Sequence, residues 1–556
     1  MNEQNQDQSF DVIVVGSGAG AITAAITAAK QGLKTVIIEK ASTWGGSSSL
    51  SGGGVWIPNN PVSVAAGLKD SFEEALTYLE TVIEDVGPAS SKERKMTFLQ
   101  NGPEMIRFLQ NEGMSFIAGT LYPDYYPDKP GGKIGRSLDC EFFDRCKLGE
   151  LSKTLRVSDM LPPIPFSTSE VAHLPKAFTQ FKHFFKVVDM FARGTKLKIS
   201  GKQALGLGNA LVAQLMFVAQ KYDVPVWLNT PCNRLIMEGE KVVGIEVTKD
   251  GGPLSLYSNA VILAAGGFER NAEMRQKYQG VGSDWTVANP DNTGDVIKQC
   301  MDIGADMALL DDSWWGAVAV DHKGNRHFLV WERSMPHSLI VDQSGERYMN
   351  ESQSYVDVGH DMLKQNKEGK AIPSWLILES RNRNRYIFGM AMPRLTPKEY
   401  IEEGFFLKAN TIEELAEKCE INSENLQSTI LRFNEFADKG VDEDFERGRT
   451  TYDNYYGDPN YKNPNLGKIE KGPFYAVKIY PGDLGTKGGM VTDEYARVLK
   501  DGEPISGLYA TGNCSASVMG RTYPGPGSTL GPAMVFSYIA AKHLAENESK
   551  DMKISS

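Results

Sequence analysis

The sequence has no long apolar run and no paired cysteines, and both absences narrow what the chain can be. No stretch reaches the ~18 apolar residues that span a bilayer. The polar start, MNEQNQDQSF, lacks the basic region and apolar core of a signal peptide. The six cysteines form no CxxC pair, so neither a disulfide framework nor a zinc site is predicted. We therefore expect a cytoplasmic protein.

An excess of basic residues is also missing. The chain has 59 Lys and Arg against 70 Asp and Glu, a formal net charge of -11, which argues against nucleic-acid binding as its main task. The seven histidines show no metal-ligand spacing, so no metal site is predicted. Hydrophobic residues at 41% and charged residues at 23% are typical of a folded protein. The 556 residues, at ~100 to 200 per domain, predict two or more structural units.

Glycine is abundant, and its clusters indicate where ligands bind. The 55 glycines are ~10% of the chain, against a typical ~7%. In DVIVVGSGAGAITAAITAAKQGLKTVIIEK, an apolar β-branched run at residues 12–15 meets a glycine turn, an alanine-rich stretch of helical length and a second apolar run at 35–38. This order of strand, helix and strand predicts a βαβ unit in a Rossmann-like α/β domain.

The glycine turn of this unit has the spacing of a dinucleotide-binding site. Gly16, Gly18 and Ala21 fit GxGxxG/A, where bare backbone approaches a pyrophosphate at a helix N-terminus. Glu39 ends the second strand 23 residues after Gly16, where a carboxylate accepts hydrogen bonds from ribose hydroxyls. The alternatives are a tight turn without a ligand and, for Glu39, a solvated strand end.

A second cluster, GGSSSLSGGG at residues 45–54, favours FAD over NAD. In isolation it would be a flexible linker, but beside a nucleotide fold and the apolar VWIP we interpret it as backbone wrapped around a large, buried cofactor. The distal GLYATGN and the turn at 527–531 would close over the same molecule and supply the donors that an isoalloxazine ring needs. No His or Cys lies in an attachment motif, so noncovalent FAD is predicted. The candidate cofactor-binding residues are Gly16, Gly18, Gly20, Ala21, Glu39, Lys40, Gly45, Gly46, Ser47, Ser51, Gly52, Gly53, Ala265, Gly266, Gly512, Asn513, Gly527, Thr529 and Leu530.

The βαβ rhythm is lost in the middle of the chain and returns near its end. Residues 313–478 carry long mixed segments, and the glycine-rich pattern resumes at PGDLGTKGGM. We expect a discontinuous Rossmann-like FAD-binding domain, residues 1–312 and 479–556, with an inserted α+β catalytic domain at residues 313–478. Two tryptophans at the start of the insert, Trp314 and Trp315, either face a substrate or pack across the domain seam.

Residues 176–202 differ electrostatically from the rest of the chain. Seven Lys and Arg against one acid, Asp189, give a local charge of +6. Phe178, Phe181, Phe185, Val188 and Phe191 recur at three- to four-residue steps, while Lys182 and Lys186 lie elsewhere. This spacing predicts an amphipathic helix. Such a helix either docks on an anionic membrane surface or packs into the core with a solvated basic face.

Several motifs together resemble the bacterial 3-ketosteroid Δ1-dehydrogenases, within the fumarate reductase type flavoproteins. They include GGSSSLSGGGVWIPNN, PDYYPDKPGG, NESQSYVD, PGDLGTKGG, GLYATGN and TYPGPGSTLGPAM, and the resemblance runs from about residue 10 to 545. In that family the first Tyr of DYY, the Tyr of NESxxY, and the Tyr and last Gly of YPGxG are catalytic. The resemblance thus implies Tyr125, Tyr355, Tyr523 and Gly527 as catalytic residues, with Tyr122 and Tyr126 as alternatives to Tyr125.

The resemblance also implies a reaction and its partners. A double bond forms between C1 and C2 of a 3-keto-4-ene steroid when a C2 proton and a C1 hydride are removed. Tyr355 would be the base toward C2, assisted by Tyr125, and the Tyr523 hydroxyl and Gly527 N–H would hold the enolate oxygen. FAD would accept the hydride and pass its electrons to an acceptor such as a quinone.

Three rival functions remain at this point. A dicarboxylate reductase of the same superfamily needs cationic side chains and an arginine proton donor, but the motif positions carry tyrosines. A 3-ketosteroid Δ4-(5α)-dehydrogenase shares the cofactor and the chemical logic. A flavin-bound membrane adaptor or redox sensor would use residues 176–202 without turning over a steroid.

Overall fold

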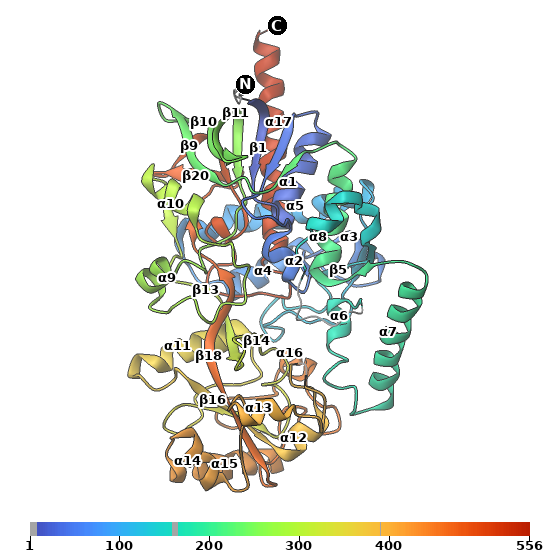
Figure 1. The fold of residues 1–556 in the computed structure, drawn as a ribbon, viewed down its shortest axis with the longest axis vertical. Coiled ribbons are helices and arrows are strands. Elements are labelled where there is room, and N and C mark those ends of the chain that lie inside the picture. Colours follow the sequence, from blue (N-terminus) through green and yellow to red (C-terminus); the bar gives the residue numbers. More distant parts are fainter. Residues whose placement is uncertain (1–7, 158–164, 390, 556) are drawn as a thin grey trace.

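The computed structural model describes residues 8–157, 165–389 and 391–555, and two large sheets organise them. They lie one above the other along the long axis of the molecule (Figure 1). The first sheet has eight strands in the order β20-β21-β11-β1-β2-β8, with β10 and β9 joined beside β11. Its strands are β1 (Gln8–Val15), β2 (Thr35–Ile38), β8 (Val226–Trp227), β9 (Cys232–Glu238), β10 (Lys241–Lys249), β11 (Gly252–Leu263), β20 (Arg497–Lys500) and β21 (Glu503–Ala510).

The centre of this sheet confirms the predicted Rossmann-like α/β fold. β1 pairs in parallel with β11 on one side and β2 on the other. Residues 12–15 are buried, as expected of apolar β-branched residues covered on both faces of a parallel sheet. α1 (Ala19–Lys30) follows β1 and packs against α8 (Leu207–Gln220) and α17 (Leu530–Ser555). Its small alanine side chains permit this close approach.

The second sheet is antiparallel and comes from the middle of the chain. Its order is β14-β13-β18-β16-β15, with β17 paired to β18. The strands are β13 (Ser313–Val320), β14 (Arg326–Phe328), β15 (Ser338–Val341), β16 (Ser374–Glu379), β17 (Leu407–Ala409) and β18 (Phe474–Thr486). α14 (Ile412–Cys419) and α15 (Ser423–Lys439) share one apolar core with this sheet. The domain limits at 312 and 478 stay predictions, and β18 extends past the second of them.

A long irregular segment crosses between the sheets and carries Tyr125. Buried Asp124 accepts hydrogen bonds from Trp56 Nε1 and Arg136 Nη1, each at 2.8 Å, and the Tyr125 N–H donates to Pro524 O at 2.9 Å. A buried carboxylate is stable only when it is paired and hydrogen-bonded, so these contacts hold the loop in one conformation. They also attach Tyr125 to the turn that precedes Gly527.

The amphipathic segment forms helix α7 (Phe181–Ile199), which follows the short helix α6 (Thr168–Val171) and projects from one side of the molecule (Figure 1). Arg193 and Lys186 of α7 bind Glu170 of α6, at 2.8 Å and 3.2 Å. The side chains of Phe181 and Phe185 are 83% and 64% exposed. The predicted helix is therefore confirmed over residues 181–199, Phe178 precedes its first turn, and the Phe181 and Phe185 side chains face outward. Neither α7 nor another helix in the described ranges combines the length and apolar character needed to cross a membrane.

Candidate active site

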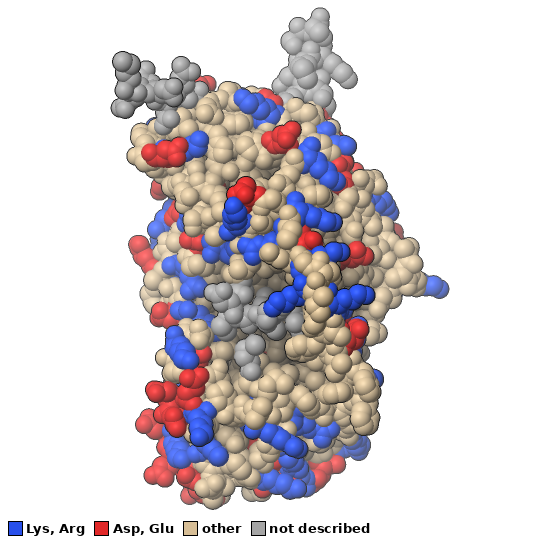
Figure 2. All heavy atoms as spheres, turned by 45° about the vertical axis from the view of Figure 1, so that its right-hand side comes forward, with Lys and Arg blue, Asp and Glu red and all other residues tan. Residues whose placement is uncertain are grey.

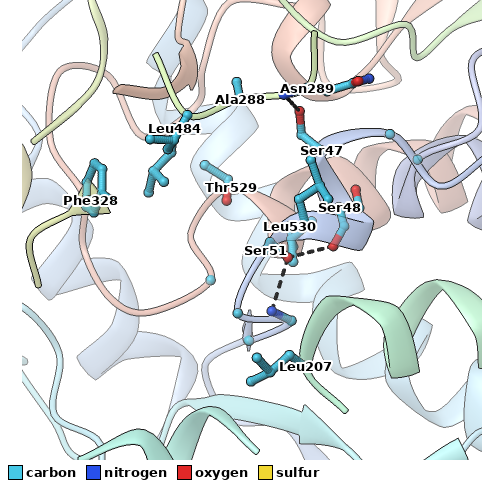
Figure 3. Close-up of a pocket in the computed structure, with 18 of the residues that line it drawn as sticks. Ser47, Ser48, Ser51, Leu207, Ala288, Asn289, Phe328, Leu484, Thr529 and Leu530 are labelled. Carbon is cyan, nitrogen blue, oxygen red and sulfur yellow. Dashed lines mark hydrogen bonds between the residues drawn. The ribbon is translucent and has the colours of Figure 1, made fainter. Parts of the chain in front are cut away.

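A cavity of about 980 Å³ opens between the two sheets and brings the candidate residues together. Every predicted cofactor-binding and catalytic residue lines it except Gly45. In Figure 3, Ser47 and Ser48 lie on one side of this space, Phe328 and Leu484 lie on the other, and Thr529 lies between them. The glycine clusters and the tyrosine motifs, which are far apart in the sequence, thus border one continuous site.

One end of the cavity has the features of a nucleotide site. Gly16 has φ +108°, and a Cβ there would lie 2.3 Å from Ala264 O, so only glycine fits this turn. Gly18 is the N-cap of α1, whose N-terminus borders the cavity. Glu39 accepts hydrogen bonds from Ser17 Oγ at 2.6 Å and Ala41 N at 3.0 Å. Burial nevertheless raises the pKa of Glu39 above its ordinary value.

The Gly/Ser cluster is more regular than expected. Within the cluster, residues 46–50 form a short helix, α2 (Gly46–Leu50). Gly45 lies outside the lining and holds the turn into α2, with φ +109° and its N–H donating to Ser17 Oγ at 3.0 Å. Ser48 Oγ accepts from the Ala19 N–H at 3.0 Å. The cluster therefore packs against the start of α1 and leaves the cavity open beside it.

The helix α17 contributes a second N-terminus at the cavity. Thr529 and Leu530 line it where α17 begins, and a Cβ on Gly20 of α1 would lie 3.0 Å from Ala533 O of α17, so the first turns of α1 and α17 are neighbours. Helix N-termini carry partial positive charge and unpaired N–H groups. Two adjacent N-termini suit the phosphates of a dinucleotide. The residues therefore fit FAD, with the ribose near Glu39 and the reactive ring toward the tyrosines.

A further polar wall of the cavity was not predicted from the sequence. The Asn292 amide donates to Ser47 Oγ at 3.0 Å and to the buried Glu269 Oε1 at 2.6 Å. Lys40 binds Thr293 Oγ1 at 2.5 Å and Asp295 Oδ2 at 2.7 Å. The residues of this wall are Asn289, Asp291, Asn292, Thr293, Gly294 and Asp295, all of which line the cavity. The one sequence feature that could have indicated these residues is the run of turn-forming residues NPDNTGD at 289–295.

The three candidate catalytic tyrosines form a buried cluster at the other end. Tyr125 Oη donates to Tyr355 Oη at 3.3 Å. The Tyr523 ring lies 5.1 Å from the Tyr125 ring and 5.2 Å from the Tyr355 ring, centroid to centroid. The Tyr523 hydroxyl lies 3.5 Å from Thr529 Oγ1. Tyr355 begins α11 (Tyr355–Gln365), so three separate segments bring these hydroxyls together.

The protein environment keeps these phenols protonated. Burial raises the pKa of Tyr355 well above its ordinary value, and the hydrogen bond from Tyr125 offsets only part of this effect. Burial also raises the pKa of Tyr523, against hydrogen bonds that act in the opposite direction. The described residues alone therefore favour the phenol of Tyr355 over the phenolate that a base requires.

The two alternatives to Tyr125 make different contacts. The Tyr122 hydroxyl pairs with that of Tyr456 at 2.8 Å, and the Tyr126 hydroxyl donates to Asp357 Oδ1 at 3.1 Å. Among these three neighbours, Tyr125 is the one whose hydroxyl bonds to Tyr355. The geometry therefore favours Tyr125 as the assisting residue.

The tryptophans Trp314 and Trp315 pack behind the site. Trp314 contacts the Tyr523 ring edge-on at 5.1 Å, and its Nε1 donates to Asn513 Oδ1 at 3.2 Å. Trp315 Nε1 donates to Asp312. Neither lines the cavity, so of the two interpretations the structure favours packing at the seam.

The Gly527 N–H forms a hydrogen bond to the Tyr523 hydroxyl that acts to lower the pKa of that phenol, so the two donors of the expected oxyanion site are neighbours. Gly527 has φ +99°, and a Cβ there would lie 2.3 Å from Gly54 O. Within the described ranges, its carbonyl accepts from Gly531 N at 2.9 Å while its own N–H makes no backbone hydrogen bond. Both Gly527 and Tyr523 line the cavity, so their donors are available to one ligand oxygen there.

The rest of the cavity beyond the tyrosines is largely apolar. This wall combines β14, the loop after α12 (Ser380–Arg385) and the face of α7, and its side chains include Leu174, Ala177, Phe178, Val187, Phe191, Phe328, Val330, Trp331, Ile387, Met392 and Leu484. Such a lining favours a large apolar ligand over a dicarboxylate.

Comparisons with known proteins agree with this arrangement. A family model described as an FAD binding domain matches residues 11–530. A 3-oxosteroid 1-dehydrogenase of Mycolicibacterium smegmatis is 45% identical, over 98% of this chain and 99% of the relative. A 4-oxocyclohexanecarboxylate 2-dehydrogenase of Sinomonas cyclohexanicum is 35% identical, over 97% and 93%. The crystal structure of 3-ketosteroid Δ1-dehydrogenase from Sterolibacterium denitrificans in complex with 1,4-androstadiene-3,17-dione superimposes with a TM-score of 0.92 at 38% identity, over 97% of this chain and 100% of that one.

Proposed function

Because the chain belongs to the 3-ketosteroid Δ1-dehydrogenases, a family of FAD-dependent flavoproteins, we propose that it introduces a C1–C2 double bond into the A ring of 3-ketosteroids. The observation that carries this proposal is the contact of Tyr125, Tyr355 and Tyr523 beside Gly527 in a cavity that continues into the dinucleotide site. The relatives' names describe dehydrogenation next to a ring ketone, which is the chemistry that such a cluster serves.

We propose the following roles for the tyrosines and Gly527. The Tyr523 hydroxyl and the Gly527 N–H donate hydrogen bonds to the C3 oxygen, which acidifies C2 because the enolate charge is stabilised there. A positioned donor of this kind contributes about 3 to 4 kcal/mol to the transition state. Tyr355 then accepts the C2 proton, with Tyr125 hydrogen-bonded to its oxygen. Bound FAD supplies the hydride acceptor for C1.

Anaerobic reduction of the bound flavin tests this function directly. Adding androst-4-ene-3,17-dione without oxygen should abolish the visible flavin absorbance, because the hydride has no onward acceptor. The matched control is 1,4-androstadiene-3,17-dione, which already has the double bond and should leave the flavin oxidised. Unchanged absorbance with both steroids would favour the adaptor or redox-sensor function.

Product analysis with a saturated steroid separates the rival enzyme functions. A saturated 5α-3-ketosteroid should yield a 1-ene product in a Δ1-dehydrogenase and a 4-ene product in a Δ4-(5α)-dehydrogenase. Product identification by mass spectrometry and NMR therefore distinguishes the two. A dicarboxylate reductase is disfavoured by the apolar lining and by tyrosines at the reacting positions.

The pKa of Tyr355 predicts an alkaline activity profile. Because burial raises that pKa above its ordinary value of about 10, the base form is scarce at neutral pH and grows as pH rises. We expect the rate of flavin reduction by steroid to increase from about pH 7 to about pH 10 without a plateau. Rapid-mixing absorbance measures it, and the rate of reoxidation is the control. A flat profile would contradict the proposed base.

We also propose that α7 docks on an anionic membrane surface and admits apolar ligands from it. Phe178, Val188 and Phe191 of the aromatic stripe line the cavity and are also exposed, so one stripe borders both solvent and site. In Figure 2, which turns this side forward, Lys and Arg side chains border the central hollow. Exposed apolar area beside positive charge is what interfacial helices need. A quinone, as the electron acceptor, is apolar enough to use the same entrance.

Vesicle co-sedimentation tests this docking. Lys186 is paired with Glu170, so its replacement would disturb α7 itself, whereas Lys182 and Lys198 are exposed. Lys182→Glu with Lys198→Glu should reduce binding to anionic phospholipid vesicles, as should added salt. Lys241→Glu with Lys298→Glu, on β10 and α10 (Asp295–Asp302) at the far side in Figure 1, is the control. Equal recovery of wild type in the supernatant with and without vesicles would contradict docking.

A further inference from the structure

A pair of tyrosine hydroxyls borders the apolar part of the cavity, apart from the catalytic cluster. Tyr122 Oη and Tyr456 Oη lie 2.8 Å apart, and both side chains are buried and line the cavity. Tyr456 follows α16 (Thr451–Tyr455) and packs beside Val330 and Trp331. Tyr122 stacks on Tyr455, with ring centroids 4.7 Å apart. The pair therefore lies on the wall that leads away from the catalytic tyrosines.

The two hydroxyl groups of this pair have one O–H donor more than their shared hydrogen bond uses. Each tyrosine hydroxyl has one hydrogen to donate. One of the two hydrogens lies between the oxygens, and within the described ranges neither hydroxyl has another hydrogen-bond partner. Burial raises the pKa of Tyr122 and of Tyr456 well above the ordinary value, so both hydrogens remain in place. A buried donor without an acceptor is unfavourable, and the cavity is where an acceptor can be supplied.

Two other polar groups on this wall, His327 and Glu332, are already engaged by the protein. His327 Nε2 lies 3.1 Å from Asp321 Oδ2. Glu332 accepts hydrogen bonds from the Gly389 N–H at 3.0 Å and the Val330 N–H at 3.2 Å. The tyrosine pair thus differs from His327 and Glu332 in having a neutral, buried donor to offer to a ligand.

We propose that Tyr122 and Tyr456 bind an oxygen that the steroid carries beyond its A ring, a hydroxyl or carbonyl on ring B, C or D. The inference rests on the proposed function, because Tyr355, Tyr523 and Gly527 place the A ring. Tyr122 and Tyr125 both pack on α16, against Tyr455 and Tyr452 with ring centroids 4.7 and 4.5 Å apart, and the pair and the cluster line one cavity, so the pair lies beside a steroid held at that cluster. The enzyme then selects among 3-ketosteroids by their oxygenation.

Matched steroids and a double variant test this selection. The substrates are androst-4-en-3-one, which has no further oxygen, and derivatives that carry one hydroxyl or carbonyl on ring B, C or D. Tyr122→Phe with Tyr456→Phe removes both hydroxyls and keeps both rings. We expect kcat/KM for the preferred oxygenated steroid to fall about ten-fold, mainly through KM, because one hydrogen bond is lost. For androst-4-en-3-one, kcat/KM should stay unchanged.

The control variant is Tyr455→Phe, which keeps the ring stacked on Tyr122 and removes a hydroxyl outside the lining. It should leave the preference intact. The dissociation constant of the matching 1,4-diene product, from the change in the flavin spectrum, gives a readout without turnover. The single variants show which hydroxyl donates to the ligand.

The outcomes separate this inference from the proposed function. An unchanged preference in the double variant, or an equal loss for oxygenated and unoxygenated steroids, would overturn the subsite while wild type still turns over steroid. If no 3-keto-4-ene steroid reduces the flavin of wild type, the proposed function itself is wrong. Flavin content and turnover of androst-4-en-3-one verify that each variant is folded.

Discussion

Replacing Tyr355 by phenylalanine should lower the rate of flavin reduction by steroid at least about 100-fold, the usual range for a positioned general base. The phenyl ring keeps the packing against Tyr125 and Tyr523, so only the oxygen that accepts the C2 proton is lost. FAD content and thermal stability should stay near wild type, because the ring packing is kept and the lost hydroxyl contacts are with Tyr125 and Tyr523 at the cavity. Single-turnover absorbance at saturating steroid measures the effect.

The control for this variant is Tyr538→Phe. Tyr538 lies on α17, and its hydroxyl donates to Glu104 Oε1 at 2.8 Å. The Tyr538 side chain does not line the cavity. This change also removes one tyrosine hydrogen bond from a mostly buried site, so it reports the general cost of such a loss. A Tyr355→Phe enzyme as fast as Tyr538→Phe would exclude Tyr355 as the base.

Gly18→Val should give colourless protein without steroid turnover. Gly18 is the N-cap of α1 at the cavity, and a Cβ there would already lie 3.2 Å from Ser48 Oγ. The two further valine carbons would occupy the space where backbone approaches the pyrophosphate. Absorbance of the purified protein and titration of the apoprotein with FAD measure the loss.

The matched control is Gly282→Val, at a glycine whose added Cβ would meet nothing nearer than Asp284 Oδ2 at 3.5 Å. This variant should remain yellow. Circular dichroism of both proteins distinguishes loss of the cofactor from loss of the fold. A folded Gly18→Val protein with a full complement of FAD would contradict the assigned pyrophosphate site.

Local motifs were predictable because the physics that they report is local. The β-branched run before Gly16 and the alanines after it specify a strand and a helix without reference to the rest of the chain. The helical turn α2 within the Gly/Ser cluster was not predicted, because it is accompanied by a distant contact, the Ala19 N–H with Ser48 Oγ. The spacing within the cluster contains no sign of that partner.

Contacts between residues far apart in the chain could not be predicted from the sequence pattern. The Asn292 amide bridges Ser47 and Glu269, and each of these bonds joins residues whose proximity is decided by sheet topology. The Tyr122–Tyr456 pair joins positions 334 residues apart. The tyrosine motifs were identified through resemblance to a family, and their catalytic roles stay predictions until the variants are measured.

The neighbouring first turns of α1 and α17 have a consequence for biosynthesis. α1 leaves the ribosome long before the strand β21 and the helix α17 that follows it, and β21 pairs with β11 in the same sheet. A nascent chain therefore lacks one of the two helix N-termini and an adjoining strand of the dinucleotide site. FAD therefore binds only after β21 and α17 have been made and have joined α1, and by binding the folded form it then shifts the folding equilibrium toward that form.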